Sequence, residues 1–185
     1  MKTFFTALRL FSFLAVLTGV LYPLAVTALA RVAFPSQANG SVITTPAGTP
    51  VGSSLLAQAN TSPRYFWPRP SAGDYATVAS GASSLAPTSA KLRDQVAARA
   101  AALRTAHNLA PDAPVPADLL FASGSGLDPH ISPAAATFQA ARVASARNVS
   151  LATITSSITA HTESGGLLGE DRVNVLLLNL ALDQN

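Results

Sequence analysis

A run of polar residues between positions 122 and 132, Ala-Ser-Gly-Ser-Gly-Leu-Asp-Pro-His-Ile-Ser, contains the residue types that hydrolytic chemistry uses. Ser125, Asp128 and His130 would supply a nucleophile, a carboxylate and a base, as in a serine hydrolase. The G-x-S-x-G elbow that exposes such a serine is missing, because glycines directly flank Ser125. A catalytic triad is also assembled by a whole fold and not by one short loop. An exported, membrane-anchored serine hydrolase therefore stays only as the alternative function.

The same loop is a poor candidate for a metal or phosphate site. Asp128 and His130 could bind a metal ion, but a closed structural site needs about four ligands. Gly124-Ser125-Gly126 comes before an expected helix N-terminus, yet neither the P-loop pattern nor G-x-G-x-x-G is present. We therefore predict no catalytic residue, no metal site and no tightly bound cofactor in this chain. The polar residues of the loop are then candidates for shaping the loop or a subunit interface: Ser123, Gly124, Ser125, Gly126, Asp128 and His130.

Three aromatic residues are consecutive at Tyr65, Phe66 and Trp67, with Arg64 and Arg69 beside them. Aromatic and basic side chains together can stack on nucleobases. Nucleic-acid binding also needs a basic face, and none is visible: three of the 12 basic residues precede residue 32, and the others balance the nine acidic residues. We predict no nucleic-acid partner. A buried or interface cluster is favoured instead, with Tyr65, Phe66, Trp67 and Arg69 as candidate interface residues.

The elements that position these residues begin with an apolar N-terminal segment. The chain has 185 residues, of which 49% are hydrophobic and 11% charged, and it has no cysteine. The stretch from Leu10 to Ala30 carries no charge and has the length of about 20 residues that spans a membrane as a helix. A cleavable signal peptide ending near Ala28-Leu29-Ala30 is the alternative, but its apolar core would be shorter, about 7–15 residues. We predict a retained, single-pass helix.

Basic residues flank this span unequally, because Lys2 and Arg9 precede it and only Arg31 follows it closely. The positive-inside rule then places the N-terminus in the cytoplasm and the remainder outside. We expect a cytoplasmic N-terminus at 1–9, a transmembrane helix at 10–30, a juxtamembrane linker at 31–40 and an extracytoplasmic domain at 41–185. Close packing of small residues drives helix association in lipid. Small residues spaced four apart on the span are therefore candidate contacts with partner helices: Ala15, Gly19, Pro23 and Thr27.

The segment after the span predicts a small α+β domain. Strands at 41–43 and 51–58 would form a hairpin through a turn at 44–50, followed by a loop at 60–73. Helices are expected at 88–107, from Pro133 to about Arg147 and after Ser150, each with a start signal. A short buried strand is expected at 119–122. The apolar run at 173–182 fits a central buried strand, with a helix as the alternative. Strands followed by helices and a final strand are typical of α+β folds.

Several motifs occur in order over nearly the whole chain: Tyr22-Pro23-Leu24, then blocks at 34–41, 52–58, 65–72, 80–85, 115–133, 142–148 and 173–183. With these motifs, the chain resembles the C subunit of the Kdp potassium-transporting ATPase, a bacterial inner-membrane complex. The resemblance implies an accessory subunit of a P-type ATPase that is not itself an enzyme. Its implied partners are a channel-like potassium-binding subunit, a P-type ATPase subunit and a small membrane peptide. ATP and potassium would be handled by the complex.

The resemblance also implies two roles for the C subunit. It is held to support assembly and stability of the complex, and it has been proposed as a catalytic chaperone that raises the ATP affinity of the ATPase subunit. The stretch proposed for nucleotide contact corresponds here to Val149, Ser150, Leu151, Ala152 and Thr153, and threonine replaces the glutamine of the pattern. This replacement and the expected orientation favour an assembly or gating role over direct ATP binding.

Overall fold

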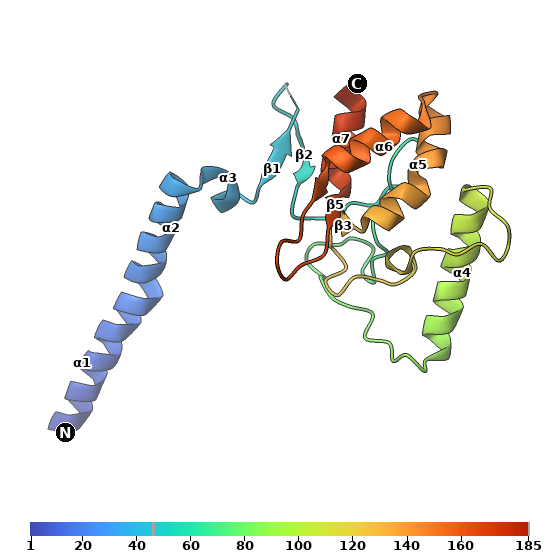
Figure 1. Ribbon diagram of the computed structural model, residues 1–185. Helices are drawn as coiled ribbons and strands as arrows, with labels where there is room; N and C mark the ends of the chain where they lie inside the picture. Colours follow the sequence, from blue (N-terminus) through green and yellow to red (C-terminus); the bar gives the residue numbers. More distant parts are fainter. Residues whose placement is uncertain (46, 185) are drawn as a thin grey trace. The chain divides into compact units, whose positions relative to one another are not determined.

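The computed structural model describes residues 1–45 and 47–184 (Figure 1). The chain divides into two compact units, Met1–Ser53 and Ser54–Asn185. The first contains a long helix and a hairpin, and the second contains helices and a small sheet. The predicted fold class, one N-terminal apolar helix followed by a small α+β domain, is confirmed.

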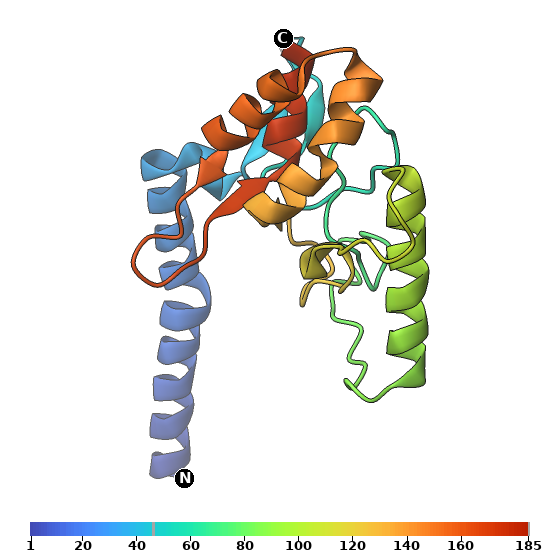
Figure 2. The same ribbon diagram turned by 45° about the vertical axis from the view of Figure 1, so that its right-hand side comes forward.

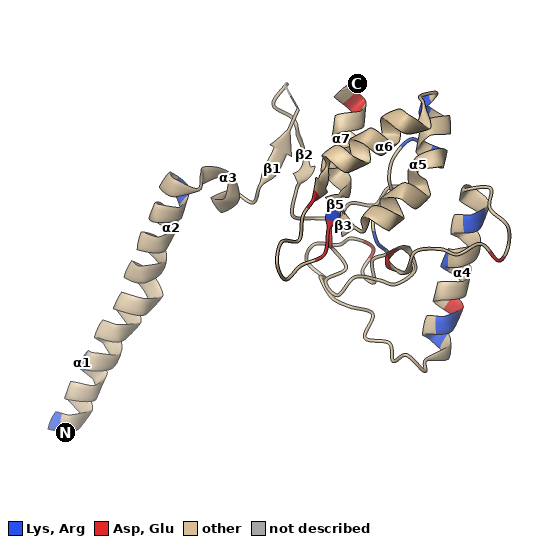
Figure 3. Ribbon diagram, viewed as in Figure 1, with Lys and Arg blue, Asp and Glu red and all other residues tan. Residues whose placement is uncertain are grey.

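A long helix makes up most of the first unit. It consists of α1 (Lys2–Val16), the π-helical segment η1 (Leu17–Leu21) and α2 (Tyr22–Ala33), and none of its residues is buried within the chain. Its central stretch carries no charged residue (Figure 3). Among the residues that the structure describes, it is the one helix long and apolar enough to cross a membrane. A single turn of helix, α3 (Pro35–Ala38), follows in the segment expected as a linker.

Pro23 accounts for the π-helical segment within this helix. Proline has no backbone N–H, so the carbonyl of Gly19, four residues earlier, has no donor in an α-helical pattern. The residues just before it, Leu17–Leu21, adopt the wider i→i+5 pattern instead. All four residues of the expected small-residue stripe are exposed, but this wider turn interrupts their regular spacing.

The expected hairpin forms with a shorter second strand. β1 (Val42–Thr44) pairs antiparallel with β2 (Pro50–Ser53). Within the turn expected at 44–50, residue 46 lies outside the described residues. The strand predicted to reach residue 58 ends at Ser53, because the chain there passes into the second unit. In that unit, the backbone N–H of Ala57 donates to the carbonyl of Leu127 at 2.9 Å.

Three short strands form the sheet of the second unit: β3 (His130–Ile131), β4 (Thr162–Glu163) and β5 (Arg172–Asn174). Their order is β3-β5-β4, and both outer strands run antiparallel to β5. The strand expected at 173–182 is therefore central, as predicted, but it is much shorter than expected because it ends at Asn174. From Val175 the chain forms the helix α7 (Val175–Gln184).

Asn174 explains this change from strand to helix. Its side-chain oxygen accepts a hydrogen bond from the backbone N–H of Leu177 at 3.2 Å, as an N-cap residue does. Val175, Leu178 and Leu182 then fall on one face of α7 and are buried. The apolar run is thus mainly a buried helix, which was the alternative left open by its pattern.

The remaining helices form where the sequence predicts them, although the first begins at Ala90 and not at residue 88. α4 (Ala90–Ala106), α5 (Pro133–Arg147) and α6 (Leu151–Ala160) follow Ser89, Ser132 and Ser150, whose hydroxyls each accept a backbone N–H. The strand expected at 119–122 is wrong. Ala117–Leu119 forms the 3-10 turn η2, because Pro116 presets a turn conformation and only Leu119 of this segment is fully buried.

The core lies among the C-terminal helices and the sheet. α5 packs on α6, α6 packs on α7, and both α5 and α7 contact β5. The largest fully buried side chains include Phe66, Ile131, Ile154 and Leu178. α4 stands to one side of these helices in both views (Figures 1 and 2), and its Leu103 reaches into the core. The loop at 60–73 also supplies part of the core, through Phe66.

Candidate functional site

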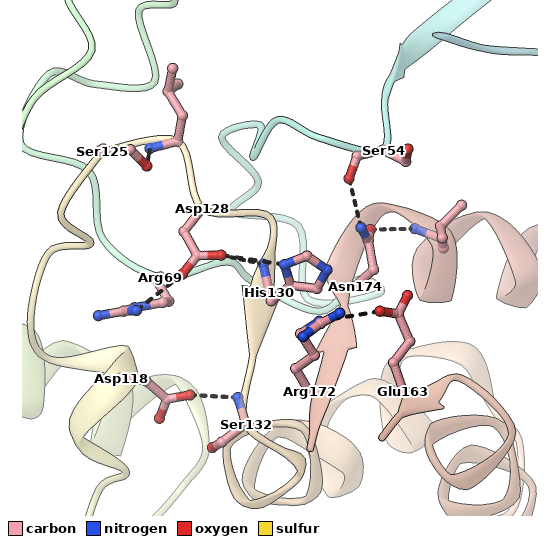
Figure 4. A network of polar contacts seen from close by, with 12 residues as sticks. Ser54, Arg69, Asp118, Ser125, Asp128, His130, Ser132, Glu163, Arg172 and Asn174 are labelled. Atoms are coloured by element: carbon pink, nitrogen blue, oxygen red, sulfur yellow. Dashed lines mark hydrogen bonds and ion pairs between the residues drawn. The ribbon is translucent and has the colours of Figure 1, made fainter. Parts of the chain in front are cut away.

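Asp128 organises the polar loop that the sequence singled out (Figure 4). Its Oδ2 accepts a hydrogen bond from Nη1 of Arg69 at 3.0 Å, and its Oδ1 accepts from the backbone N–H of His130 at 3.0 Å. The imidazole Nδ1 of His130 lies 3.5 Å from the same Oδ1. Nearby, Asp118 accepts from the backbone N–H of Ser132 at 2.7 Å, which fixes the start of α5. The structure thus brings Arg69, Asp128 and His130 together.

Ser125 is not part of this arrangement. Its Oγ accepts a hydrogen bond from the backbone N–H of Leu127 at 3.1 Å, and its carbonyl accepts from Ser80 Oγ at 2.9 Å and from the N–H of Gly81 at 2.8 Å. In Figure 4 the Ser125 side chain turns back to its own loop and not toward the imidazole of His130. A triad needs the imidazole between the serine and the carboxylate. The hydrolase alternative is therefore not supported.

A pocket of about 270 Å³ lies beside this network and is lined by His130 and by charged residues of both signs, including Arg69, Asp128, Asp171 and Arg172. Within residues 1–45 and 47–184, no group of three or more His, Asp or Glu side chains is arranged to bind a metal ion. Two of the nearby carboxylates already pair with arginines, Asp128 with Arg69 and Glu163 with Arg172. These contacts shape the loop and the sheet edge.

The aromatic segment is bound by two side-chain amides, each of which contacts the backbone of one residue. Gln139 on α5 accepts from the N–H of Trp67 at 2.8 Å and donates to its carbonyl at 3.1 Å. Asn179 on α7 does the same for Phe66, at 2.7 Å and 3.0 Å. Both amides are buried. They act in place of a neighbouring strand, because buried backbone groups need hydrogen-bond partners.

Arg142 on α5 contacts the same segment through its guanidinium group. Nη1 donates to the carbonyls of Pro63 at 2.7 Å and Tyr65 at 3.1 Å, and Nη2 donates to Oε1 of Gln139 at 2.8 Å. The guanidinium carbon lies 4.1 Å from the centroid of the Trp67 ring, a cation–π contact. Burial lowers the pKa of Arg142 to about 10, so the group is still charged at neutral pH.

His107, which ends α4, binds to Arg142 as a neutral imidazole. Its Nδ1 lies 2.7 Å from the carbonyl of Leu103, and its Nε2 accepts from Nε of Arg142 at 3.2 Å. These two contacts require the proton on Nδ1, since Nε2 faces a donor. Burial is the main cause that lowers the pKa of His107, and the charge of Arg142 lowers it further.

A second arginine of α5, Arg147, joins the loop to the C-terminal helix. Its Nε donates to the carbonyl of Arg64 and its Nη2 donates to Oδ1 of Asp183, both at 2.7 Å. The hydroxyl of Tyr65 donates to Oδ2 of Asp183 at 2.9 Å. This hydrogen bond is the main cause that raises the pKa of Tyr65. α5 and α7 together therefore clamp the aromatic segment, and we call Gln139, Arg142, Arg147, Asn179 and Asp183 the clamp residues.

Sequence reasoning singled out the aromatic segment but missed the side chains that clamp it. Phe66 is completely buried, whereas Tyr65 and Trp67 are half-buried; an interface role for these residues stays a prediction. The sequence does contain a signal for the clamp residues, namely polar residues at positions where the helix pattern is apolar. Gln139 falls on the buried face of α5, and Asn179 interrupts the apolar run of α7. A polar side chain on a buried face needs a partner.

The stretch compared with a nucleotide-binding signature, residues 149–153, lies at the start of α6, and all its residues are exposed. The hydroxyl of Ser150 accepts from the backbone N–H of Thr153 at 3.1 Å and lies 2.8 Å from Oγ1 of Thr153. The Ser150 side chain therefore caps the helix, and the Thr153 hydroxyl bonds to this cap. Val149 and Thr153 also line a pocket of about 330 Å³ together with Arg64, Arg147 and Asp183.

Comparison with known proteins decides the family. The family model described as the K⁺-transporting ATPase c chain, KdpC, matches residues 4–184. The chain belongs to the KdpC family. It is similar to the potassium-transporting ATPase KdpC subunit of Rhodospirillum rubrum, with 56% identity over 188 residues that cover 100% of this chain and 96% of the relative.

Two further KdpC subunits show a comparable identity over most of their length. The subunit from Myxococcus xanthus is 53% identical over 99% of this chain and 88% of its own length. The subunit from Sorangium cellulosum is 54% identical over 96% of this chain and 95% of its own length. As a KdpC family member, the chain is a membrane-associated subunit of a potassium-transporting ATPase complex, and the resemblance drawn from its motifs is confirmed.

Proposed function

We propose that this chain is a non-catalytic subunit that supports the assembly and stability of the potassium-transporting complex. The observation that carries this proposal is the family match over residues 4–184. The polar loop agrees with it, because Ser125 and Asp128 are engaged in contacts that shape the loop. The proposed partners are a channel-like potassium-binding subunit, a P-type ATPase subunit and a small membrane peptide. ATP and potassium are handled by the complex.

The long helix anchors the chain in the inner membrane, with its N-terminus in the cytoplasm and the second unit outside. Lys2 and Arg9 before the span, against Arg31 after it, support this orientation. A catalytic-chaperone effect on the ATPase subunit would then act through subunit contact. Direct ATP contact at residues 149–153 is disfavoured, because the hydroxyls of Ser150 and Thr153 already bond to each other and ATP is on the opposite side of the membrane.

Co-purification tests the proposal. The chain, expressed with the rest of the complex, should be recovered in equal stoichiometry through a tag on the ATPase subunit. Its deletion should lower the yield of intact complex and of potassium-stimulated ATPase activity. The chain purified alone should hydrolyse neither ATP nor simple esters. A hydrolytic activity of the isolated chain that Ser125→Ala abolishes would replace this proposal with the hydrolase.

The anchor is tested separately by the intact mass of the chain extracted from membranes. The expected mass includes residues 1–30. A mature chain that begins at Arg31 would show that the apolar segment is a cleaved signal peptide, and the association with the complex would then depend on the second unit alone.

A further inference from the structure

The loop between β4 and β5 carries two adjacent leucines that contact nothing in the described chain. Leu167 is 100% exposed and Leu168 is 99% exposed. Single exposed apolar residues are common on protein surfaces, and Val78, at 101%, is one of them. Two large apolar side chains, both fully hydrated and next to each other at a loop tip, are different. They form a small apolar surface in contact with water, and its burial against a partner would be energetically favourable.

The loop is built to present this pair. The backbones of Gly165 and Gly169 approach so closely at its neck that a side chain on either glycine would collide with the backbone of the other. A hydrogen bond also joins the two ends of the loop: the N–H of Gly165 donates to Oδ1 of Asp171 at 3.2 Å. Gly166 has a φ of 65°, which glycine adopts without strain. The two leucines therefore project from a constrained turn.

The charges around the leucines indicate the kind of partner. Between residues 163 and 172 there are three acidic residues, Glu163, Glu170 and Asp171, and one basic residue, Arg172. Arg172 pairs with Glu163 at 3.2 Å, so Glu170 and Asp171 give the loop its negative charge. An anionic lipid surface would repel this loop, whereas an apolar pocket edged by Lys or Arg would attract it.

We infer that the Leu167–Leu168 tip docks into an apolar pocket with a basic rim on another subunit of the same complex. This inference rests on the proposed function, because it needs a partner subunit on the same side of the membrane as the second unit. Full burial of one leucine changes an association constant by about tenfold or more. The tip is thus large enough to contribute substantially to subunit association. The acidic residues beside it would orient the tip toward the basic rim of the pocket.

Binding of purified chain to a complex purified without it tests the inference. The double variant Leu167→Ser/Leu168→Ser should raise the apparent Kd at least about tenfold. The matched control Val78→Ser removes an equally exposed apolar side chain on another loop, and its Kd should equal that of the wild type. Glu170→Lys should raise the Kd several-fold at low salt and less at high salt. The thermal midpoint of each variant should be unchanged, since these side chains pack against nothing.

A photoreactive amino acid at position 167 identifies what covers the tip. A cross-link to a subunit peptide that contains apolar residues and Lys or Arg is the expected result. A cross-link to lipid alone would overturn the inference and assign the tip to the membrane surface. If wild-type chain binds the complex and the double serine variant binds equally well, the inference fails while the proposed function stands. If wild-type chain neither binds the remaining subunits nor co-purifies with them after co-expression, the proposed function fails.

Discussion

Arg142 shows how much of the second unit depends on the shape of one side chain. Its guanidinium donates to three backbone carbonyls, to Gln139 and to His107, and it lies against the Trp67 ring. Arg142→Lys should lower the free energy of unfolding by about 2–3 kcal/mol, because a single ammonium group cannot replace a planar fork and leaves buried acceptors without donors. Chemical denaturation of the chain in detergent measures the loss.

Arg93→Lys is the matched control for this substitution. Arg93 lies on α4 and pairs with Asp94 at 3.0 Å, but both side chains are mostly exposed. Such a pair contributes little, so the free energy of unfolding should change by less than about 0.5 kcal/mol. Similar losses in the two lysine variants would mean that the geometry of the Arg142 contacts does not matter.

His107 should make the stability of the chain depend on pH. Burial lowers its pKa below the ordinary value of 6.5, so the unfolded chain takes up a proton more readily than the folded one. The contribution to stability is complete above pH 6.5 and is lost as the pH falls from there toward the lowered pKa of the folded state. His107→Gln should therefore flatten the fall in denaturation midpoint as the pH drops below about 6.5. A decline as steep as that of the wild type would assign the effect to other groups.

At the level of the elements, the loop at 123–127 is positioned by one glycine. Gly126 has a φ of 70°, and a Cβ there would lie 3.0 Å from the carbonyl oxygen of Gly81 and 3.1 Å from Oγ of Ser71. Gly126→Ala should therefore cost about 1–2 kcal/mol of unfolding free energy. Gly124→Ala is the matched control in the same loop, because a Cβ there meets nothing within 4 Å. If both variants unfold at the same denaturant concentration, the close approach of the two loops is not a constraint.

The elements that could be predicted from the sequence are those with local signals. Ser89, Ser132 and Ser150 mark the starts of three helices because a cap acts within its own first turn. The run at 173–182 is apolar on all sides, so only the Asn174 cap distinguishes helix from strand there. The contact between Gln139 and Trp67 joins residues 72 positions apart. No spacing in the sequence predicts such a contact, and for this reason the clamp residues were missed.

On the scale of the whole molecule, the chain combines one long apolar helix with a second unit that carries equal numbers of basic and acidic residues. The helix has no buried residue within the chain, so lipid or partner helices must cover it. The second unit has its own core, clamp and loops. The function of the chain as a subunit therefore depends on which side of the membrane presents the second unit to its partners.

Cysteine labelling should reveal that side. The chain contains no cysteine, so each introduced cysteine reports one position. Thr88 is exposed just before α4, and Thr3 is exposed at the start of the long helix. A cysteine at position 88 should react with a membrane-impermeant reagent in intact spheroplasts, whereas a cysteine at position 3 should react only after the membrane is opened, because the retained Lys2 and Arg9 favour a cytoplasmic N-terminus. Labelling of position 3 and protection of position 88 in intact spheroplasts would invert the orientation. The second unit would then face the cytoplasm, and residues 149–153 would again be candidates for direct contact with ATP.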